Sequence, residues 1–132
     1  MEELLLEYDI VTLVACNDKK QLIKDLFSMG IQVKAYDYDP HFKDFEHYEV
    51  KDFVFDEVEL KGCVVNFNCE KTYPLGLIYK GDMILIGDND KHNGDCNPIE
   101  NCEQLITQNE IKHVYSTDIN GKHFIVHGTN IS

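Results

Sequence analysis

Apolar and polar residues at the start of the chain follow the pattern of a strand, a helix and a second strand. Residues 8–16 are β-branched and aromatic-rich, which predicts a buried strand. Asn17 or Asp18 is expected to cap the following helix, and Gly30 to end it. Residues 31–36 predict the second strand, so we expect an N-terminal β-α-β unit with a parallel crossover. The helix has an apolar stripe of Leu22, Ile23, Leu26 and Phe27.

The middle of the chain has a weaker pattern. Beyond Tyr48 neither alternating face is cleanly apolar, which indicates a bulge or bend within residues 53–56. Residues 63–69 predict a strand. Two short apolar runs, 75–79 and 83–86, flank Lys80-Gly81-Asp82 and predict a hairpin.

The last third predicts a helix and a second hairpin. Asn97 as N-cap, Pro98 at the first helical position and Glu100 three residues after the cap predict a helix start. Asn120-Gly121 is a strong hairpin signal, and it would place Asp118 directly opposite His123. The apolar side chains expected in the core of these elements are Ile99, Cys102, Leu105, Ile106, Phe124 and Val126. We therefore expect one globular domain, 1–132, of the α+β class, with a mostly antiparallel sheet, β-hairpins and two helices.

Charge narrows the possible functions. The chain of 132 residues has a net charge of −12, and all twelve basic residues are lysines. Phosphate and nucleic-acid sites usually use the planar fork of arginine, so direct nucleic-acid binding is not expected. No apolar run has the length of a membrane span, and the N-terminus is acidic where a signal peptide would be basic. We expect a cytoplasmic protein that does not bind membranes.

Three groups of residues have the side chains of a metal site or a catalytic site, but their spacing does not favour either. Five cysteines without a leader indicate reduced thiols, and the separations of Cys63 from Cys69 and of Cys96 from Cys102 are poor for zinc. The Asp/Asn-rich loop Asp88–Asp95 resembles a calcium loop in part, but a lysine stands at a ligand position. Asp118 and His123 would form a half-exposed pair without an activated nucleophile. We therefore assign no catalytic residue, metal ligand or cofactor.

The most unusual stretch is Asp37–Glu59. It holds nine carboxylates and only two lysines, a net −7 out of the −12, with aromatic residues between the acids. That much apolar content predicts a folded negative surface and not a disordered acidic tail. The residues expected to contact a partner are Asp37, Tyr38, Asp39, Phe42, Asp44, Glu46, Tyr48, Glu49, Asp52, Asp56, Glu57 and Glu59.

Such a surface favours capture of a basic protein. The first hypothesis is a small acidic binding or inhibitor protein, of the immunity, antitoxin or nucleic-acid-mimic type, that neutralises a basic, nucleic-acid-processing protein. One alternative is a small metal-dependent enzyme, similar to a nuclease or hydrolase, that uses carboxylates of the same stretch. Another is a structural or interaction subunit.

Overall fold

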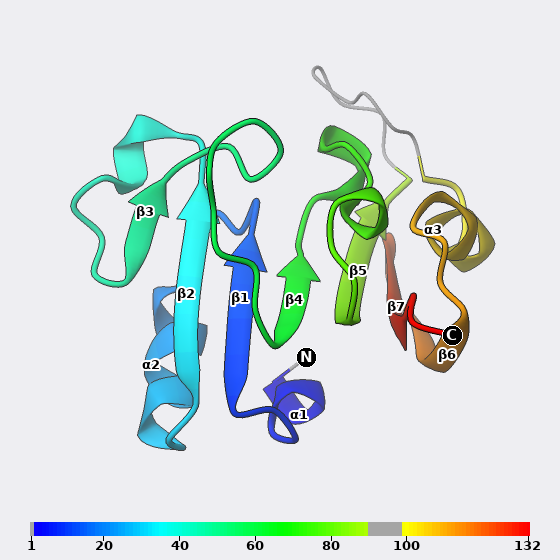
Figure 1. Ribbon diagram of the computed structural model, residues 1–132, viewed down its shortest axis with the longest axis horizontal. Helices are drawn as coiled ribbons and strands as arrows, with labels where there is room; N and C mark the ends of the chain where they lie inside the picture. Colours follow the sequence, from blue (N-terminus) through cyan, green and yellow to red (C-terminus); the bar gives the residue numbers. More distant parts are fainter. Residues whose placement is uncertain (1, 90–98) are drawn as a thin grey trace. The chain divides into compact units, whose positions relative to one another are not determined.

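The computed structural model describes residues 2–89 and 99–132. The chain divides into two compact units, Met1–Val64 and Val65–Ser132, and each is described by itself. Figure 1 labels their helices and strands. The expectation of a single domain stays a prediction.

Unit 1 is built on parallel strands. β1 (Ile10–Val14) pairs in parallel with β2 (Gln32–Asp37), and β2 pairs in parallel with β3 (Tyr48–Val50). The strand order is β3-β2-β1-β4, where β4 (Cys63–Asn66) crosses the boundary between the units. The two strands predicted around residues 8–16 and 31–36 are confirmed.

Helix α2 (Lys20–Ser28) lies between β1 and β2 in sequence and packs against β2 (Figure 1). Its buried side chains are Ile23 and Leu26, so the predicted stripe is right at its centre. It is wrong at Phe27, which is 38% exposed and lies against His47 at the surface, with ring centroids 4.2 Å apart and the ring planes tilted by 33°. A further short helix, α1 (Glu2–Leu5), was not predicted from the sequence.

A second layer covers the opposite face of the parallel strands. The segment 51–62, which follows β3 in the chain, crosses this face without regular secondary structure. Thr12 accepts a hydrogen bond from the Lys61 amide and donates one to the Lys61 carbonyl, and the Tyr36 hydroxyl bonds in the same way with Glu59. We call this side of the strands the covered face.

Unit 2 is antiparallel. β5 (Asp82–Asp88) pairs with β7 (His123–Thr129), and β7 pairs with β6 (His113–Asn120), in the order β5-β7-β6. Helix α3 (Cys102–Gln108) contacts β7 and β6. Ile99, Leu105, Phe124 and Val126 are buried as predicted, whereas Cys102 and Ile106 are only half-buried.

The predicted hairpin of residues 75–79 with 83–86 is wrong. Leu75–Leu77 forms a 3-10 turn, and β5 pairs with β7 instead. Side-chain amides occupy the backbone groups that a hairpin would need: the Gly76 amide donates to Asn109, and Asn130 donates to the carbonyls of Gly76 and Tyr79. These long-range contacts are invisible in a local sequence pattern.

The last helix begins later than predicted. Its N-cap is Asn101, whose side chain accepts from the Gln104 amide, while the Gln104 side chain accepts from the Glu100 amide. The Asn101 side chain thus caps the helix, and the Gln104 side chain binds the amide of the residue before the cap, an arrangement similar to a capping box. The N-cap lies four residues after the predicted one, Asn97. Asn97 and Pro98 lie outside the described residues.

The hairpin of β6 and β7 is confirmed, but its register is not. Asn120 pairs with His123, which leaves Gly121-Lys122 as the two-residue loop with Gly121 at φ +63°. Asp118 consequently pairs with Ile125, and His123 lies 3.9 Å from Asp88. The prediction placed the wrong two residues in the loop because Asn120-Gly121 and Gly121-Lys122 both suit a tight turn.

The described strands are therefore of mixed type, parallel in unit 1 and antiparallel in unit 2. The α+β class is plausible for this combination of strands and helices, but a mostly antiparallel sheet is wrong. β3 adds a further parallel strand beside β2, but its three residues are too few to give a sequence pattern. Within the described part of the chain, no helix is long and apolar enough to cross a membrane.

Candidate functional site at the carboxyl edge of the parallel strands

Three loops of unit 1 meet at one edge of its sheet. Because β1, β2 and β3 are parallel, their carboxyl ends lie at the same edge. The loops that leave it are 15–19 after β1, 38–39 after β2 and 51–56 after β3. We call these loops, together with Asp37, the carboxyl edge. Ligands of open α/β sheets bind at such an edge.

The turn after β1 has an unusual backbone. Ala15 and Asn17 have φ of 48° and 51°, a conformation that side chains with a Cβ rarely adopt. The residue between them, Cys16, is completely buried. Glycines occupy the first turn of dinucleotide-binding folds because they adopt this conformation without steric strain. The chain therefore makes a turn suited to glycine from other residues.

Asp37 at the end of β2 holds this turn in place. Its carboxylate accepts the Asn17 amide at 2.8 Å and the Asp39 amide at 3.0 Å, and the residue is only 3% exposed. Asn17 and Asp37 are twenty residues apart in the sequence. In dinucleotide-binding units an acidic residue about twenty positions after the first turn binds the ribose hydroxyls. Asp37 stands at the same spacing from the turn after β1, at the end of β2.

Tyr48, the first residue of β3, closes the other side of the turn. Its hydroxyl donates to the Asn17 carbonyl at 2.6 Å and accepts the Lys19 amide at 2.7 Å. Burial raises the pKa of Tyr48 further above its ordinary value, so the phenol keeps the proton that it donates to the Asn17 carbonyl. Burial also raises the pKa of the Cys16 thiol to about 12, and the thiol is neither ionised nor activated at neutral pH.

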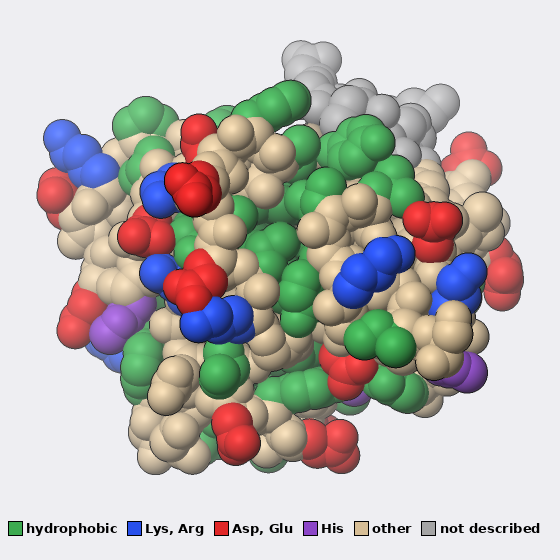
Figure 2. Space-filling view, in the orientation of Figure 1, with side chains coloured by type: hydrophobic (Ala, Val, Ile, Leu, Met, Phe, Trp, Pro, Cys, Tyr) green, Lys and Arg blue, Asp and Glu red, His purple; other side chains and the backbone are tan. Residues whose placement is uncertain are grey.

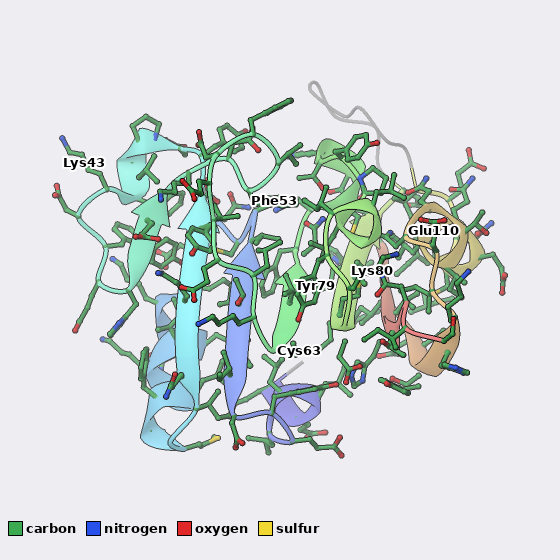
Figure 3. The ribbon with its side chains drawn as sticks, in the orientation of Figure 1. Lys43, Phe53, Cys63, Tyr79, Lys80 and Glu110 are labelled. Atoms are coloured by element: carbon green, nitrogen blue, oxygen red, sulfur yellow. The ribbon has the colours of Figure 1, made fainter. Side chains whose placement is uncertain are left out.

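The loop after β3 forms its own turns. The Asp52 carboxylate accepts the Val54 amide, and Asp56 accepts the Asp52 amide at 2.7 Å. Phe53, labelled in Figure 3, is buried. Phe55 is 86% exposed, and Tyr38, in the loop after β2, is 69% exposed. Two aromatic rings of the carboxyl edge therefore face solvent beside acidic residues.

The twelve residues predicted to contact a partner occupy three places in unit 1. One group belongs to the carboxyl edge: Asp37, Tyr38, Asp39, Asp52 and Asp56. A second lies between β2 and β3, before or at the start of β3: Phe42, Asp44, Glu46 and Tyr48. The third lies on β3 and the covering segment: Glu49, Glu57 and Glu59.

Asp37, Phe42 and Tyr48 are corrections to the predicted surface because they are buried. The Phe42 ring stacks on Tyr48 with centroids 5.4 Å apart and meets Phe45 edge-on. These aromatic residues are interleaved with the acids because they form the core under this segment. Lys43, at the surface of the same segment, is exposed and points outward (Figure 3).

A groove of about 330 Å³ lies on the covered face of unit 1. Its charged residues form two ion pairs, Lys34 with Glu49 at 3.5 Å and Lys61 with Glu59. Figure 2 shows acidic and basic side chains next to one another over this part of the molecule. Since the charges pair with each other, the groove gives no preference for a charged ligand.

The remaining candidates gain no support. The described residues contain no group of three potential metal ligands among His, Cys, Asp and Glu. Cys63 lies in β4 and Cys69 in a 3-10 turn, so the two do not share a strand as predicted; both are buried. The register of β6 and β7 separates Asp118 from His123. Cys96 and most of the loop Asp88–Asp95 lie outside the described residues.

Comparison with models of known protein families, with curated proteins and with solved structures gives no match to this chain. Any assignment of function must therefore start from the carboxyl edge itself.

Proposed function

We propose that unit 1 binds a nucleoside at the carboxyl edge, with Asp37 accepting hydrogen bonds from the ribose hydroxyls. The observation that carries this proposal is the hydrogen bond from the Asn17 amide to Asp37, which joins the turn after β1 to the end of β2. A β-α-β unit with a carboxylate at this position is the arrangement that recognises ribose in dinucleotide-binding folds. Each carboxylate oxygen has two acceptor positions, so the two backbone bonds leave acceptors for hydroxyl donors. Because Asp37 is only 3% exposed, a ribose reaches these acceptors when the loops of the carboxyl edge move aside.

The charge of the edge restricts the ligand to a nucleoside without phosphate. Phosphate sites of this kind use a glycine-rich turn whose backbone amides point at the ligand. Here the Asn17 amide points at Asp37, and the Lys19 amide at the Tyr48 hydroxyl. Asp18, Asp39, Asp52 and Asp56 add negative charge to the same loops. A neutral or positively charged nucleoside suits this environment better than a nucleotide.

The test changes the ligand and uses the unmutated protein, so a difference in binding cannot come from a change in the fold. Amide chemical shifts of the whole chain are followed while adenosine, guanosine, cytidine and uridine are added separately. We expect at least one to shift residues 15–19 and 37–39. Its 2′,3′-dideoxy analogue should bind at least about tenfold more weakly, since it lacks the bonds to a charged acceptor. The 5′-monophosphate should also bind more weakly. If no ribonucleoside shifts these amides at millimolar concentration, the proposal is wrong.

A second candidate function is the capture of a basic protein, such as a nucleic-acid-processing enzyme or toxin. The observation in its favour is the exposure of Tyr38 and Phe55 beside acidic residues. Exposed aromatic residues are the common anchors of protein interfaces, and surrounding carboxylates speed the approach of a basic partner. In this proposal the chain acts as an inhibitor without turnover.

This candidate is tested by association kinetics against a panel of basic nucleases. Changing Asp44, Glu46 and Glu57 to their amides should slow association by about tenfold at low salt, and Tyr38→Ala should speed dissociation. The matched control changes Glu7, Glu103 and Glu110, which are also exposed. Equal effects of the two sets would show that the stretch Asp37–Glu59 is not the interface.

A further inference from the structure

The dipeptide Asn120-Gly121 lies at the tip of the β6–β7 hairpin and is open to solvent. Asn120 is the last residue of β6 and is exposed, as are Gly121 and Lys122 of the loop. A Cβ placed on Gly121 would meet nothing within 4 Å apart from its neighbours in the chain. The strand ladder ends at the pair of Asn120 with His123, so the Gly121 amide lies in the loop, outside the ladder.

The side chain of an asparagine that precedes a glycine can react with its own main chain. Attack of the Gly121 nitrogen on the Cγ carbon of Asn120 closes a five-membered ring, and glycine has no Cβ to obstruct the approach. Because both groups belong to one chain, the step needs no bimolecular encounter. Both are accessible in this hairpin, and the loop gives them room to meet.

The register of β5, β7 and β6 places an imidazole beside this asparagine. His123 pairs with Asn120 on one side and with Asp88 on the other, so the three side chains form one row across the sheet. Residues directly opposite each other on antiparallel strands have Cβ atoms about 5 Å apart. The His123 imidazole also lies 3.9 Å from the Asp88 carboxylate, which stabilises the positive charge of the ring once it has accepted a proton. A neutral imidazole in this place can act as a general base for the neighbouring loop.

We propose that Asn120 is a site of self-modification, at which the side-chain amide is converted to a carboxylate without a second protein. The Gly121 nitrogen gives its proton to His123 and bonds to the Cγ carbon of Asn120. The Cγ–Nδ2 bond breaks, and ammonia leaves with the proton that His123 returns. A cyclic imide remains.

Water then opens the imide, and its hydrogen returns to the Gly121 nitrogen. Attack of water on Cγ gives aspartate, whereas attack on the main-chain carbonyl carbon of residue 120 gives isoaspartate. The sum of the steps consumes one water and releases one ammonia, and nothing is oxidised or reduced.

Either product changes the end of the hairpin. Both add one negative charge to a chain of net −12, on the strand face that already carries Asp88 and Asp118. Isoaspartate also lengthens the main chain by one methylene group, so the pair with His123 loses its register. This inference concerns unit 2 and is independent of the nucleoside proposal for unit 1.

Peptide mapping of the native full chain, incubated in mildly alkaline buffer, tests the proposal. Mass spectrometry follows each asparagine separately and distinguishes Asn120 from Asn93, which also precedes a glycine. We expect Asn120 to be converted at least about tenfold faster than Asn109 and Asn130, whose side chains are buried and hydrogen-bonded to the main chain. The products should include isoaspartate, which an isoaspartyl methyltransferase labels. An Asn120 that stays intact for as long as Asn109 and Asn130 would overturn the proposal.

Histidine variants test the base. His123→Gln should slow the conversion of Asn120 several-fold, while amide chemical shifts of residues 116–120 report whether the hairpin is kept. The matched control His113→Gln changes an exposed histidine at the other end of β6 and should react like the native chain. Added imidazole should speed the reaction of His123→Ala more than that of the native chain, which a purely structural role of His123 would not produce. A native rate in His123→Gln, or equal responses to imidazole, would show that His123 is not the base.

Discussion

The Asn17 amide donates a hydrogen bond to the Asp37 carboxylate at 2.8 Å, and this bond ties the turn after β1 to the end of β2. Asp37 accepts the Asp39 amide as well, so one buried carboxylate fixes two loops of the carboxyl edge. Hydrogen bonds to a charged acceptor are stronger than neutral ones, and a buried partner left unsatisfied is costly.

Asp37→Asn should therefore destabilise the fold. The amide keeps one acceptor but turns an NH₂ group toward a backbone N–H, and the expected loss is about 1–3 kcal/mol of unfolding free energy. Urea denaturation measures it. Asp44→Asn makes the same chemical change at an exposed position and should alter stability by less than about 0.5 kcal/mol. Equal stability of the two variants would refute this role of Asp37.

Ala15→Gly should increase stability despite removing a buried methyl group. Ala15 has φ 48°, a left-handed conformation that costs a non-glycine residue about 1–2 kcal/mol. Glycine relieves this cost, although its greater freedom in the unfolded chain offsets part of the gain. The control is Ala35→Gly in β2, where the alanine is fully buried in a regular strand and glycine should destabilise. A loss of stability in both variants would contradict the argument.

The turn at Ala15 could not be predicted from the local sequence pattern, although the strands on either side of α2 could. The apolar runs of β1 and β2 predict both strands because buried parallel strands need uniformly apolar residues. The left-handed turn between them carries no glycine, and therefore gave no signal. The spacing of Asn17 and Asp37 was visible in the sequence, but without the turn it had no meaning.

The acidic stretch shows a second limit. Its charge was evident from the sequence, yet the distribution of that charge depends on how the chain turns at Asp37, Phe42 and Tyr48, all of which are buried. Similarly, the side-chain amides of Asn109 and Asn130 bind the backbone near Gly76 from more than thirty residues away. Such contacts decide local structure and leave no trace in a window of neighbouring residues.

Tyr48→Phe should destabilise unit 1 without creating a cavity. The hydroxyl satisfies both the Asn17 carbonyl and the Lys19 amide, and its loss leaves two backbone groups without this partner. We expect a cost of about 1–3 kcal/mol by urea denaturation. Tyr38→Phe removes the hydroxyl of an exposed tyrosine and should have little effect. If the two changes cost the same, the Tyr48 hydroxyl does not hold the turn.

Leu26→Ala and Phe27→Ala distinguish the core of α2 from its surface. Leu26 is fully buried, so its truncation should cost about 2–5 kcal/mol. Phe27 stands next to it in sequence but keeps 38% of its surface exposed, so its loss should cost clearly less. Thermal unfolding of the two variants, compared with the native chain, measures the difference. A larger cost at Phe27 would mean that α2 is rotated relative to the structure.

Stability should fall at alkaline pH, in part through Cys16. Burial raises the pKa of this thiol from 9.0 to about 12, so between these values the unfolded chain loses the proton while the folded chain keeps it. The unfolded state then binds fewer protons, and the free energy of unfolding decreases as pH rises. The contribution of the Cys16 thiol to stability is complete below pH 9.0 and is lost as the pH rises towards about 12. Cys16→Ala removes this contribution, so its urea midpoint should fall less steeply from pH 8 to 11 than that of the native chain. The buried Cys69 and Tyr48, whose pKa values are also raised, contribute to the decline that remains. Identical slopes for the variant and the native chain would show that the Cys16 thiol ionises equally in both states.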